Sequence, residues 1–345
     1  MSGEAISVLA AVAGIVPSTH IRLFSPFERL SLADEVTFEL IADTAVDAAQ
    51  IARSDVLIVQ RSTSALMPGV FRAARAQGVP VVYECDDNFL EITRDVDVVG
   101  AYYSDPFVQR LFKQSLRAAD VVTVSTPVLA EAFAQYARRV QLLPNCIDPE
   151  YVGEACPAAD EGPVIIGYAG TVTHNADFEV VWPALKRILA ESPSVRMSFQ
   201  GFIPEELRDS PNVSFVPYAE DYPGFLGQLG SLGWSFAVAP LADKPFNHGK
   251  TDNKFREYSA CLIPAVYSDI PVYSRSVEDG ETGLLVPHTT EGWYAGLRRM
   301  LDEPALRARI RGNANRVVME RYSCEKAASA WLELLKELVW DRREE

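Results

Sequence analysis

The chain has 345 residues, of which 48% are hydrophobic and 23% charged, a composition that excludes disordered and collagen-like proteins. At roughly 150 residues per domain, this length predicts two domains. The 32 Lys and Arg residues against 47 Asp and Glu residues give a formal net charge of −15. Such a protein repels nucleic-acid phosphates and anionic lipid at long range, so we expect no nucleic-acid partner. A local basic pocket for a small anion stays open.

Short runs rich in Val, Ile and Tyr alternate with longer runs of helical period in the first half of the chain. This alternation is typical of parallel βαβ units in an α/β fold. The predicted strands are 6–11, 36–40, 56–60, 79–84, 121–125 and 140–143, and the predicted helices are 65–77, 108–119 and 127–135. Residues 6–16 are too few for a membrane span of roughly 20 residues and follow Glu4 rather than a basic residue, which indicates a buried strand.

A linker rich in small, acidic, Pro and Gly residues follows at 154–163. A second alternating series then predicts strands at 164–169, 195–200, 213–216, 234–239, 264–267 and 283–286, and helices at 177–192, 222–232, 251–261, 291–302, 304–322 and 325–340. We therefore expect an N-terminal domain at 1–150, a linker at 151–163, a C-terminal domain at 164–325 and a C-terminal helix at 326–345. Two Rossmann-like domains of this kind bind ligands at the carboxyl ends of their strands, facing a cleft.

The five cysteines are odd in number and form no C-x-x-C pair. This pattern predicts neither a disulfide framework nor a zinc site, and it indicates a reducing compartment. We therefore expect a cytoplasmic protein.

The segment 240–258 follows a predicted strand and leads into a predicted helix that Thr251 or Asp252 caps. The N-terminus of a helix attracts anions, and Lys250 and Lys254 add two cations beside it, so this segment predicts a cradle for a diphosphate. Glu257 lies on the helix face of Asn253 and Lys254, where its carboxylate can accept hydrogen bonds from a ribose diol. An ordinary solvated helix start is the alternative interpretation.

Two loops of the first half follow predicted strands and carry polar residues. Asp86 and Asp87 follow the strand 79–84, where they predict an acceptor contact, a Mg²⁺ or Mn²⁺ site or a cap of the next turn. The loop 14–22 carries Ser18, His20 and Arg22, which are candidates for binding an acceptor or a phosphate. No G-x-G-x-x-G follows any strand, which argues against a nicotinamide enzyme.

Several segments of the second half carry a distinctive set of motifs. They are WSFAVAPL (234–241), FN (246–247), KTDNKFREYSA (250–260), IPAV (263–266) and DGETGLLV (279–286), with NCID (145–148), GYAGT (167–171) and the helices at 293–322. Together they resemble the donor-binding domain of GT-B glycosyltransferases, in particular the retaining, family-4-like enzymes of glycosyl transferase group 1. The first half resembles this family only weakly, through ADVVTVS at 119–125.

The resemblance implies a GT-B fold and metal-independent, retaining transfer of a sugar from a nucleotide diphosphate sugar, without a cofactor. It implies that the C-terminal domain binds the donor and the N-terminal domain a glycan, lipid-linked or protein acceptor. The implied donor-binding residues are Gly170, Thr171, His174, Tyr218, Lys250, Thr251, Asn253, Lys254 and Glu257, and the candidate acceptor-binding residues are Ser18, His20, Arg22 and Asp87. Catalytic roles fall to Lys250, which stabilises the leaving diphosphate, to Glu257, which holds the ribose, and to Asp86 near the sugar.

Two departures from the family pattern leave alternatives open. The family often has a second glutamate eight residues before the position of Glu257, where this chain has Gly249. The Arg and Lys of its first C-domain loop are replaced by Thr171, His174 and Asn175. The alternatives are a non-catalytic subunit that binds a sugar nucleotide or a partner, and a metal-dependent transferase that uses Asp86 and Asp87. A peripheral contact with the inner face of the membrane, through an apolar patch of the N-terminal domain, also stays open.

Overall fold

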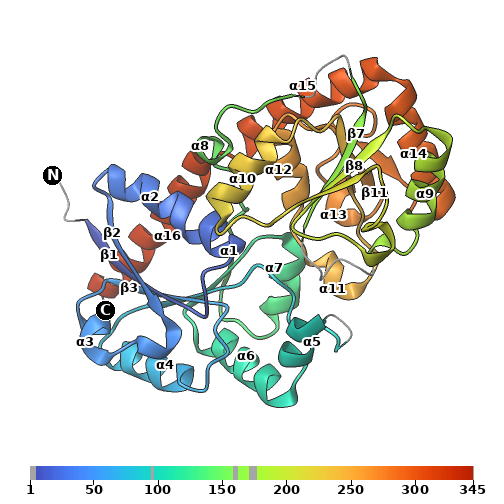
Figure 1. Cartoon of the computed structure of the whole chain (residues 1–345). Coiled ribbons are helices and arrows are strands. Elements are labelled where there is room, and N and C mark those ends of the chain that lie inside the picture. Colours follow the sequence, from blue (N-terminus) through green and yellow to red (C-terminus); the bar gives the residue numbers. More distant parts are fainter. Residues whose placement is uncertain (1–4, 95–96, 158–161, 171–176, 345) are drawn as a thin grey trace. The chain divides into compact units, whose positions relative to one another are not determined.

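The computed structural model describes residues 5–94, 97–157, 162–170 and 177–344, which form two compact units. Unit 1 comprises residues 1–146, 249–251 and 322–345, and unit 2 comprises residues 147–248 and 252–321. Each unit is a parallel six-stranded sheet with helices packed against it (Figure 1). The predicted class, α/β with two Rossmann-like domains, is confirmed.

The sheet of unit 1 has the strand order β2-β1-β3-β4-β5-β6, with all neighbours parallel. Its strands are β1 (Ile6–Val12), β2 (Val36–Ala42), β3 (Val56–Gln60), β4 (Val81–Glu84), β5 (Val121–Val124) and β6 (Val140–Leu142). Every residue of β3, β4 and β5 is buried. Strands buried on both faces are continuous apolar runs, which is why Val and Ile dominate them.

Helices cover both faces of this sheet. They are α1 (Pro17–Thr19), a π-helical segment (His20–Phe24), α2 (Ser25–Leu32), a 3₁₀ turn (Asp43–Ala45), α3 (Ala48–Ala52), α4 (Met67–Ala76), α5 (Asp97–Tyr103), α6 (Pro106–Ala118), α7 (Pro127–Ala134) and α16 (Cys324–Glu344). The last of these returns from the far end of the sequence and lies beside α2 (Figure 1). Its apolar residues, Ala328, Trp331, Leu334, Leu335, Leu338 and Val339, join the core around Val8 and Phe27.

The sheet of unit 2 has the strand order β12-β11-β10-β7-β8-β9 and is also parallel. Its strands are β7 (Ile165–Ala169), β8 (Arg196–Gln200), β9 (Val213–Val216), β10 (Phe236–Ala239), β11 (Ala265–Ser268) and β12 (Leu284–Val286). Its helices are α8 (Pro149–Val152), α9 (Val181–Glu191), a 3₁₀ turn (Glu205–Leu207), α10 (Tyr222–Ser231), α11 (Pro245–His248), α12 (Asn253–Ala260), α13 (Pro271–Ser274), α14 (Thr290–Asp302) and α15 (Pro304–Arg321).

One loop prediction is wrong. The segment 14–22 was expected to be a loop, but α1 and the π-helical segment begin at Pro17 and continue into α2. Proline is favoured at the first position of a helix because its fixed φ suits the helix and its missing N–H is not needed there. Among the described residues, no helix is both long and apolar enough to span a membrane. The five cysteines are unpaired, and only Cys156 is exposed.

Candidate active site

The carboxyl edge of the unit 2 sheet holds a buried carboxylate. Glu257 lies on α12 and is 9% exposed, and the Tyr222 hydroxyl donates to its Oε1 atom over 3.3 Å. Burial raises the pKa of Glu257, while Lys254, one turn earlier on the same helix face, lowers it. The expected spacing of Lys254 and Glu257 therefore brings the two charges together within unit 2.

Tyr218, which follows β9, lies beside this carboxylate. Its ring is 38% exposed and stacks on Phe225 with 5.2 Å between the centroids. Burial of the hydroxyl and the neighbouring Glu257 charge raise the pKa of Tyr218 to about 12. A flat, partly exposed ring next to a carboxylate can stack against a base while the carboxylate binds a sugar hydroxyl.

Two glycines lie where neighbouring groups leave no room for a side chain. Gly201 follows β8 with φ +85, and a Cβ atom there would clash with the Tyr218 ring and with the carbonyl of Gly170. Gly170 follows β7, and a Cβ atom there would clash with the Tyr168 hydroxyl. The glycine at 201 therefore lets the backbone after β8 lie against the Tyr218 ring and the end of β7. The predicted donor residues Thr171 and His174 lie outside the described residues.

The N-terminus of α12 is built differently from the sequence-based expectation. Asp252 is the N-cap residue, as predicted, but its side chain makes no capping hydrogen bond. It pairs instead with Arg256 over 2.6 Å, and both side chains are buried. Asn253 and Lys254 open the helix and are half-buried, and Lys254 Nζ lies 5.5 Å from the centroid of the Tyr168 ring. The backbone N–H groups of the first turn are thus not covered by the cap side chain.

The segment 249–251 packs with unit 1. The Gly249 carbonyl accepts a hydrogen bond from Thr126 over 3.1 Å, and the Thr251 hydroxyl donates to Ser125 over 2.8 Å. A Cβ atom at Gly249 would lie 2.8 Å from the Cβ atom of Asn88. Asn88 and Leu129 thus leave no room for a side chain at position 249. Lys250, between these anchors, acts electrostatically on Asp87.

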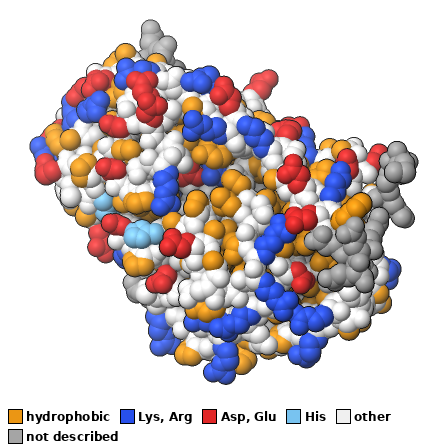
Figure 2. All heavy atoms as spheres, turned by 180° about the vertical axis from the view of Figure 1, so that it is seen from behind, with side chains coloured by type: hydrophobic (Ala, Val, Ile, Leu, Met, Phe, Trp, Pro, Cys, Tyr) orange, Lys and Arg blue, Asp and Glu red, His pale blue; other side chains and the backbone are white. Residues whose placement is uncertain are grey.

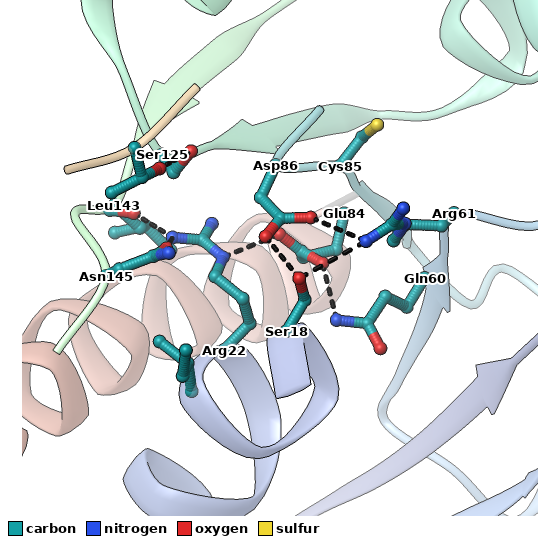
Figure 3. A network of polar contacts seen from close by, with 12 residues as sticks. Ser18, Arg22, Gln60, Arg61, Glu84, Cys85, Asp86, Ser125, Leu143 and Asn145 are labelled. Atoms are coloured by element: carbon teal, nitrogen blue, oxygen red, sulfur yellow. Dashed lines mark hydrogen bonds and ion pairs between the residues drawn. The ribbon is translucent and has the colours of Figure 1, made fainter. Parts of the chain in front are cut away.

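At the carboxyl edge of the unit 1 sheet, one arginine joins the two predicted carboxylates, and Figure 3 shows its contact with Asp86. Arg61 lies 3.3 Å from Asp86 and 2.9 Å from Asp87. Ser18 donates to Asp86 over 2.5 Å and accepts from Arg61 over 3.2 Å. The Asp86 side chain is 6% exposed and that of Asp87 is 25% exposed. Asp86, the predicted catalytic carboxylate, is thus enclosed by two protein partners, whereas Asp87 is partly exposed.

Arg22, a predicted acceptor-binding residue, is buried in unit 1. Arg22 is 2% exposed and forms an ion pair of 2.6 Å with the fully buried Glu84, which also accepts from Gln60 over 2.8 Å (Figure 3). Its guanidinium further donates to the Leu143 carbonyl and to Asn145. His20 is half-buried in the π-helical segment, with its ring 4.9 Å from that of Phe24. Arg22 therefore joins the helix after β1 to the strand ends.

Sequence reasoning missed Arg61. It follows β3 directly, and its backbone adopts the left-handed conformation with φ 55. This conformation costs a residue with a Cβ atom roughly 1–2 kcal/mol. The sequence did show a charged residue immediately after a buried strand. Its partners could not be identified, because they lie some 25 residues later, on the loop after β4. Burial opposes the Arg61 charge, but Asp87 and Asp86 outweigh it and raise the pKa of Arg61.

Within the part of the chain that the structure describes, no cluster of three or more His, Cys, Asp or Glu side chains is arranged to hold a metal ion. Arg61 also forms an ion pair with each of the two carboxylates that the metal alternative needs. These observations do not favour Asp86 and Asp87 as metal ligands.

A basic face lies at the opposite edge of unit 1. A groove of about 700 Å³ is lined by Arg75, Arg138 and Arg139, together with Val81 and Val121 at the amino ends of β4 and β5. The sequences of α4 and α6 contain basic residues and no acidic ones. Lys and Arg side chains gather over these two helices in Figure 2. This basic face is separate from the carboxyl edge that holds Arg61 and Asp87.

Comparisons with known proteins bear on the family and the fold of the chain. Residues 163–303 match the family model described as glycosyl transferases group 1. Residues 163–303 are a group 1 glycosyltransferase domain. This domain contains the β7–Gly170 loop, Tyr218 and Glu257. A D-inositol 3-phosphate glycosyltransferase of Rhodococcus opacus is 37% identical over 78 residues, which are 22% of this chain and 17% of that protein.

Solved structures show that the whole chain, and not only the matched domain, has the GT-B fold. HepE of Anabaena in complex with UDP superposes with a TM-score of 0.68 at 15% identity, covering 96% of this chain and 100% of that one. Sucrose-phosphate synthase of Thermosynechococcus elongatus gives a TM-score of 0.71 at 16% identity, covering 98% and 100%. At this identity the likeness establishes the fold, and it confirms the predicted GT-B class across both units.

Proposed function

We propose that the protein is a metal-independent, retaining glycosyltransferase whose unit 2 binds a uridine diphosphate sugar and whose unit 1 binds the acceptor. The observation that carries the proposal is the cluster of Glu257, Tyr218 and Gly170 at the carboxyl edge of a group 1 glycosyltransferase domain. HepE, which shares the fold, has been crystallised with UDP and with UDP-glucose, and this favours uridine as the base.

The donor-binding residues act as follows in this proposal. The Tyr218 ring stacks on the base, and Glu257 accepts hydrogen bonds from the ribose diol. The diphosphate lies at the start of α12, where backbone N–H groups and the cations of Lys250 and Lys254 stabilise its charge. Charge grows on the diphosphate as the bond to the sugar breaks, so these groups stabilise the transition state more than the bound donor. Thr251 and Asn253 flank this turn and complete the diphosphate site.

A thermal-shift screen tests the donor site, because a ligand that binds only the folded state raises the melting temperature. UDP, GDP, dTDP, ADP and CMP are compared, each with and without Mg²⁺. We expect UDP to raise the melting temperature equally in both conditions, and a stabilisation of about 2.7 kcal/mol at a concentration 100 times Kd. A shift only with Mg²⁺ would contradict metal independence, and no shift with any nucleotide would favour the non-catalytic alternative.

The variant Lys250→Ala distinguishes a catalytic glycosyltransferase from a non-catalytic protein that binds a sugar nucleotide. We expect a roughly 10²–10³-fold fall in kcat, as when one electrostatic stabiliser of a developing charge is removed, with a much smaller change in the Kd for UDP. Lys244→Ala is the matched control, since Lys244 is an exposed lysine of the preceding loop. Equal turnover by Lys250→Ala and wild type, measured as UDP release, would remove Lys250 from the mechanism.

The sequence left a peripheral lipid contact open on an apolar patch; we propose instead that the basic face on α4 and α6 makes it, because its local positive charge can attract anionic lipid although the net charge of the chain is −15. Each basic side chain near an anionic bilayer contributes about 1 kcal/mol, and the cations outnumber the acids on these helices. Sedimentation with phosphatidylserine vesicles at low salt should retain the wild type. It should not retain an Arg72→Glu, Arg75→Glu variant, and equal retention of both would overturn the assignment.

A further inference from the structure

The guanidinium of Arg61 is fixed from two sides. On one side it contacts Asp86 and Asp87, and on the other its Cζ atom lies 5.0 Å from the centroid of the Phe89 ring. Phe89 in turn stacks on Tyr103 of α5, with 3.7 Å between the centroids and 3° between the planes. A planar guanidinium held between an aromatic face and two carboxylates has little freedom to move.

The backbone of Arg61 is fixed as well. Its N–H donates to the Glu84 carbonyl over 2.9 Å, which continues the pairing of β3 with β4 by one residue. The left-handed φ of 55 at this residue turns the chain immediately after the strand. A non-glycine residue keeps such a conformation only where its surroundings require it, and such residues cluster at functional sites. The observed outlier lies next to the partly exposed carboxylate.

We propose that Arg61 is a positioning residue that holds Asp87 as an ionised hydrogen-bond acceptor for a hydroxyl group of a neutral polyol acceptor, such as an uncharged sugar. This inference rests on the proposed function, because it assumes that unit 1 binds the acceptor. Asp86 is enclosed by Ser18 and Arg61, so Asp87 is the carboxylate of the pair that an acceptor can reach.

The charges around Asp87 explain why the acceptor is neutral. The charged groups that act on it are Arg61 at the end of β3, Asp86 on the loop after β4 and Lys250 of the segment 249–251. With Asp87, these are two cations and two carboxylates. Arg22 and Glu84 pair with each other separately and are buried. The neighbouring Cys85 thiol and Tyr103 phenol are neutral because burial raises the pKa of each. Among the described residues that act on Asp87, no surplus positive charge remains to attract a phosphate.

Loss of the arginine changes the titration of Asp87 in a defined direction. Burial already raises the pKa of Asp87, and Arg61 opposes this rise. In Arg61→Gln the pKa of Asp87 moves further above its unfolded value, so the folded state holds the proton more tightly than the unfolded state does. The stability of the variant, relative to wild type, then falls as pH rises from the unfolded pKa through the folded pKa.

Melting temperatures across pH test the positioning role without any assay of transfer. We expect the deficit of Arg61→Gln to widen by about 3 °C or more between pH 5 and pH 8, and Arg61→Lys to restore most of it. Arg53→Gln, at an exposed arginine of the same unit, is the matched control and should show no such trend. A deficit that is equal at all pH values would indicate a packing role only and would overturn the positioning role.

Saturation-transfer NMR tests the acceptor class with free methyl glucosides and glucose phosphates as probes, in the presence of UDP. We expect the uncharged glucosides to bind wild type and to lose at least about tenfold in affinity in Asp87→Asn and Arg61→Gln, as expected when one hydrogen bond to a charged group is removed. Preferential binding of the phosphates, or no binding by wild type, would overturn the acceptor assignment. Failure of the proposed function is seen separately, as the absence of any UDP-induced thermal shift.

Discussion

Glu257 shows how a proposed binding residue can lower the stability of the fold. Its carboxylate is buried and its pKa is raised, so ionisation is less favourable in the folded chain than in the unfolded one. The folded state therefore binds the proton more tightly, and stability falls as pH rises from the unfolded pKa through the folded pKa. A neutral isostere should relieve this cost.

The variant Glu257→Gln tests the effect of this carboxylate on stability and on UDP binding. We expect its melting temperature to equal or exceed that of wild type at pH 8, with the advantage shrinking toward pH 5, where the wild-type carboxyl gains its proton. We also expect UDP to bind at least about tenfold more weakly, since a charged hydrogen-bond acceptor is worth roughly 1.5–3 kcal/mol. Glu291→Gln, at an exposed glutamate of unit 2, is the control. Unchanged UDP affinity by calorimetry would remove Glu257 from the donor site.

At the scale of elements, the strands were predictable because burial on both faces demands continuous apolar runs. The predicted strand 56–60 coincides with β3, and 213–216 coincides with β9. The helix after β1 was not found, since Gly14, Pro17 and Ser18 read as a loop although Pro17 starts a helix. The proximity of Lys254 and Glu257 on α12 was predictable from residue spacing. The contact of Arg61 with Asp87 was not, because it depends on the order of strands in the sheet.

The helix α16 supplies core residues to unit 1. Trp331 is buried, its ring centroid lies 5.3 Å from that of Phe27, and its Nε1 atom donates to the Arg22 carbonyl over 3.1 Å. We expect Trp331→Ala to lower the free energy of unfolding of unit 1 by about 3–5 kcal/mol, as for other large buried aromatic residues. Trp340→Ala, at a 64% exposed position of the same helix, should change it by less than about 0.5 kcal/mol. Similar values for both variants in urea titrations would contradict the role of α16.

At the scale of the whole molecule, the proposed contacts of Tyr218 with the base and of Glu257 with the ribose belong to unit 2. Hydrogen exchange is therefore compared with and without UDP. We expect UDP to slow the exchange of peptides from α12 and from the segment between β9 and α10. The exchange of β1, α2 and α16 should stay unchanged, because these elements form the core of unit 1. Protection concentrated in unit 1 would place the nucleotide elsewhere and would overturn the proposed donor site.

The return of α16 to unit 1 also matters while the chain is being made. The apolar side chains of Val8 and Phe27 pack against residues 328–339 in the folded protein. The ribosome adds these residues only after it has made the whole of unit 2. At 5–20 residues per second this interval lasts roughly 10–40 s. During it, the nascent unit 1 exposes a hydrophobic surface that chaperones can bind. A chain truncated before residue 324 lacks α16. We therefore expect it to be insoluble, even if unit 2 folds.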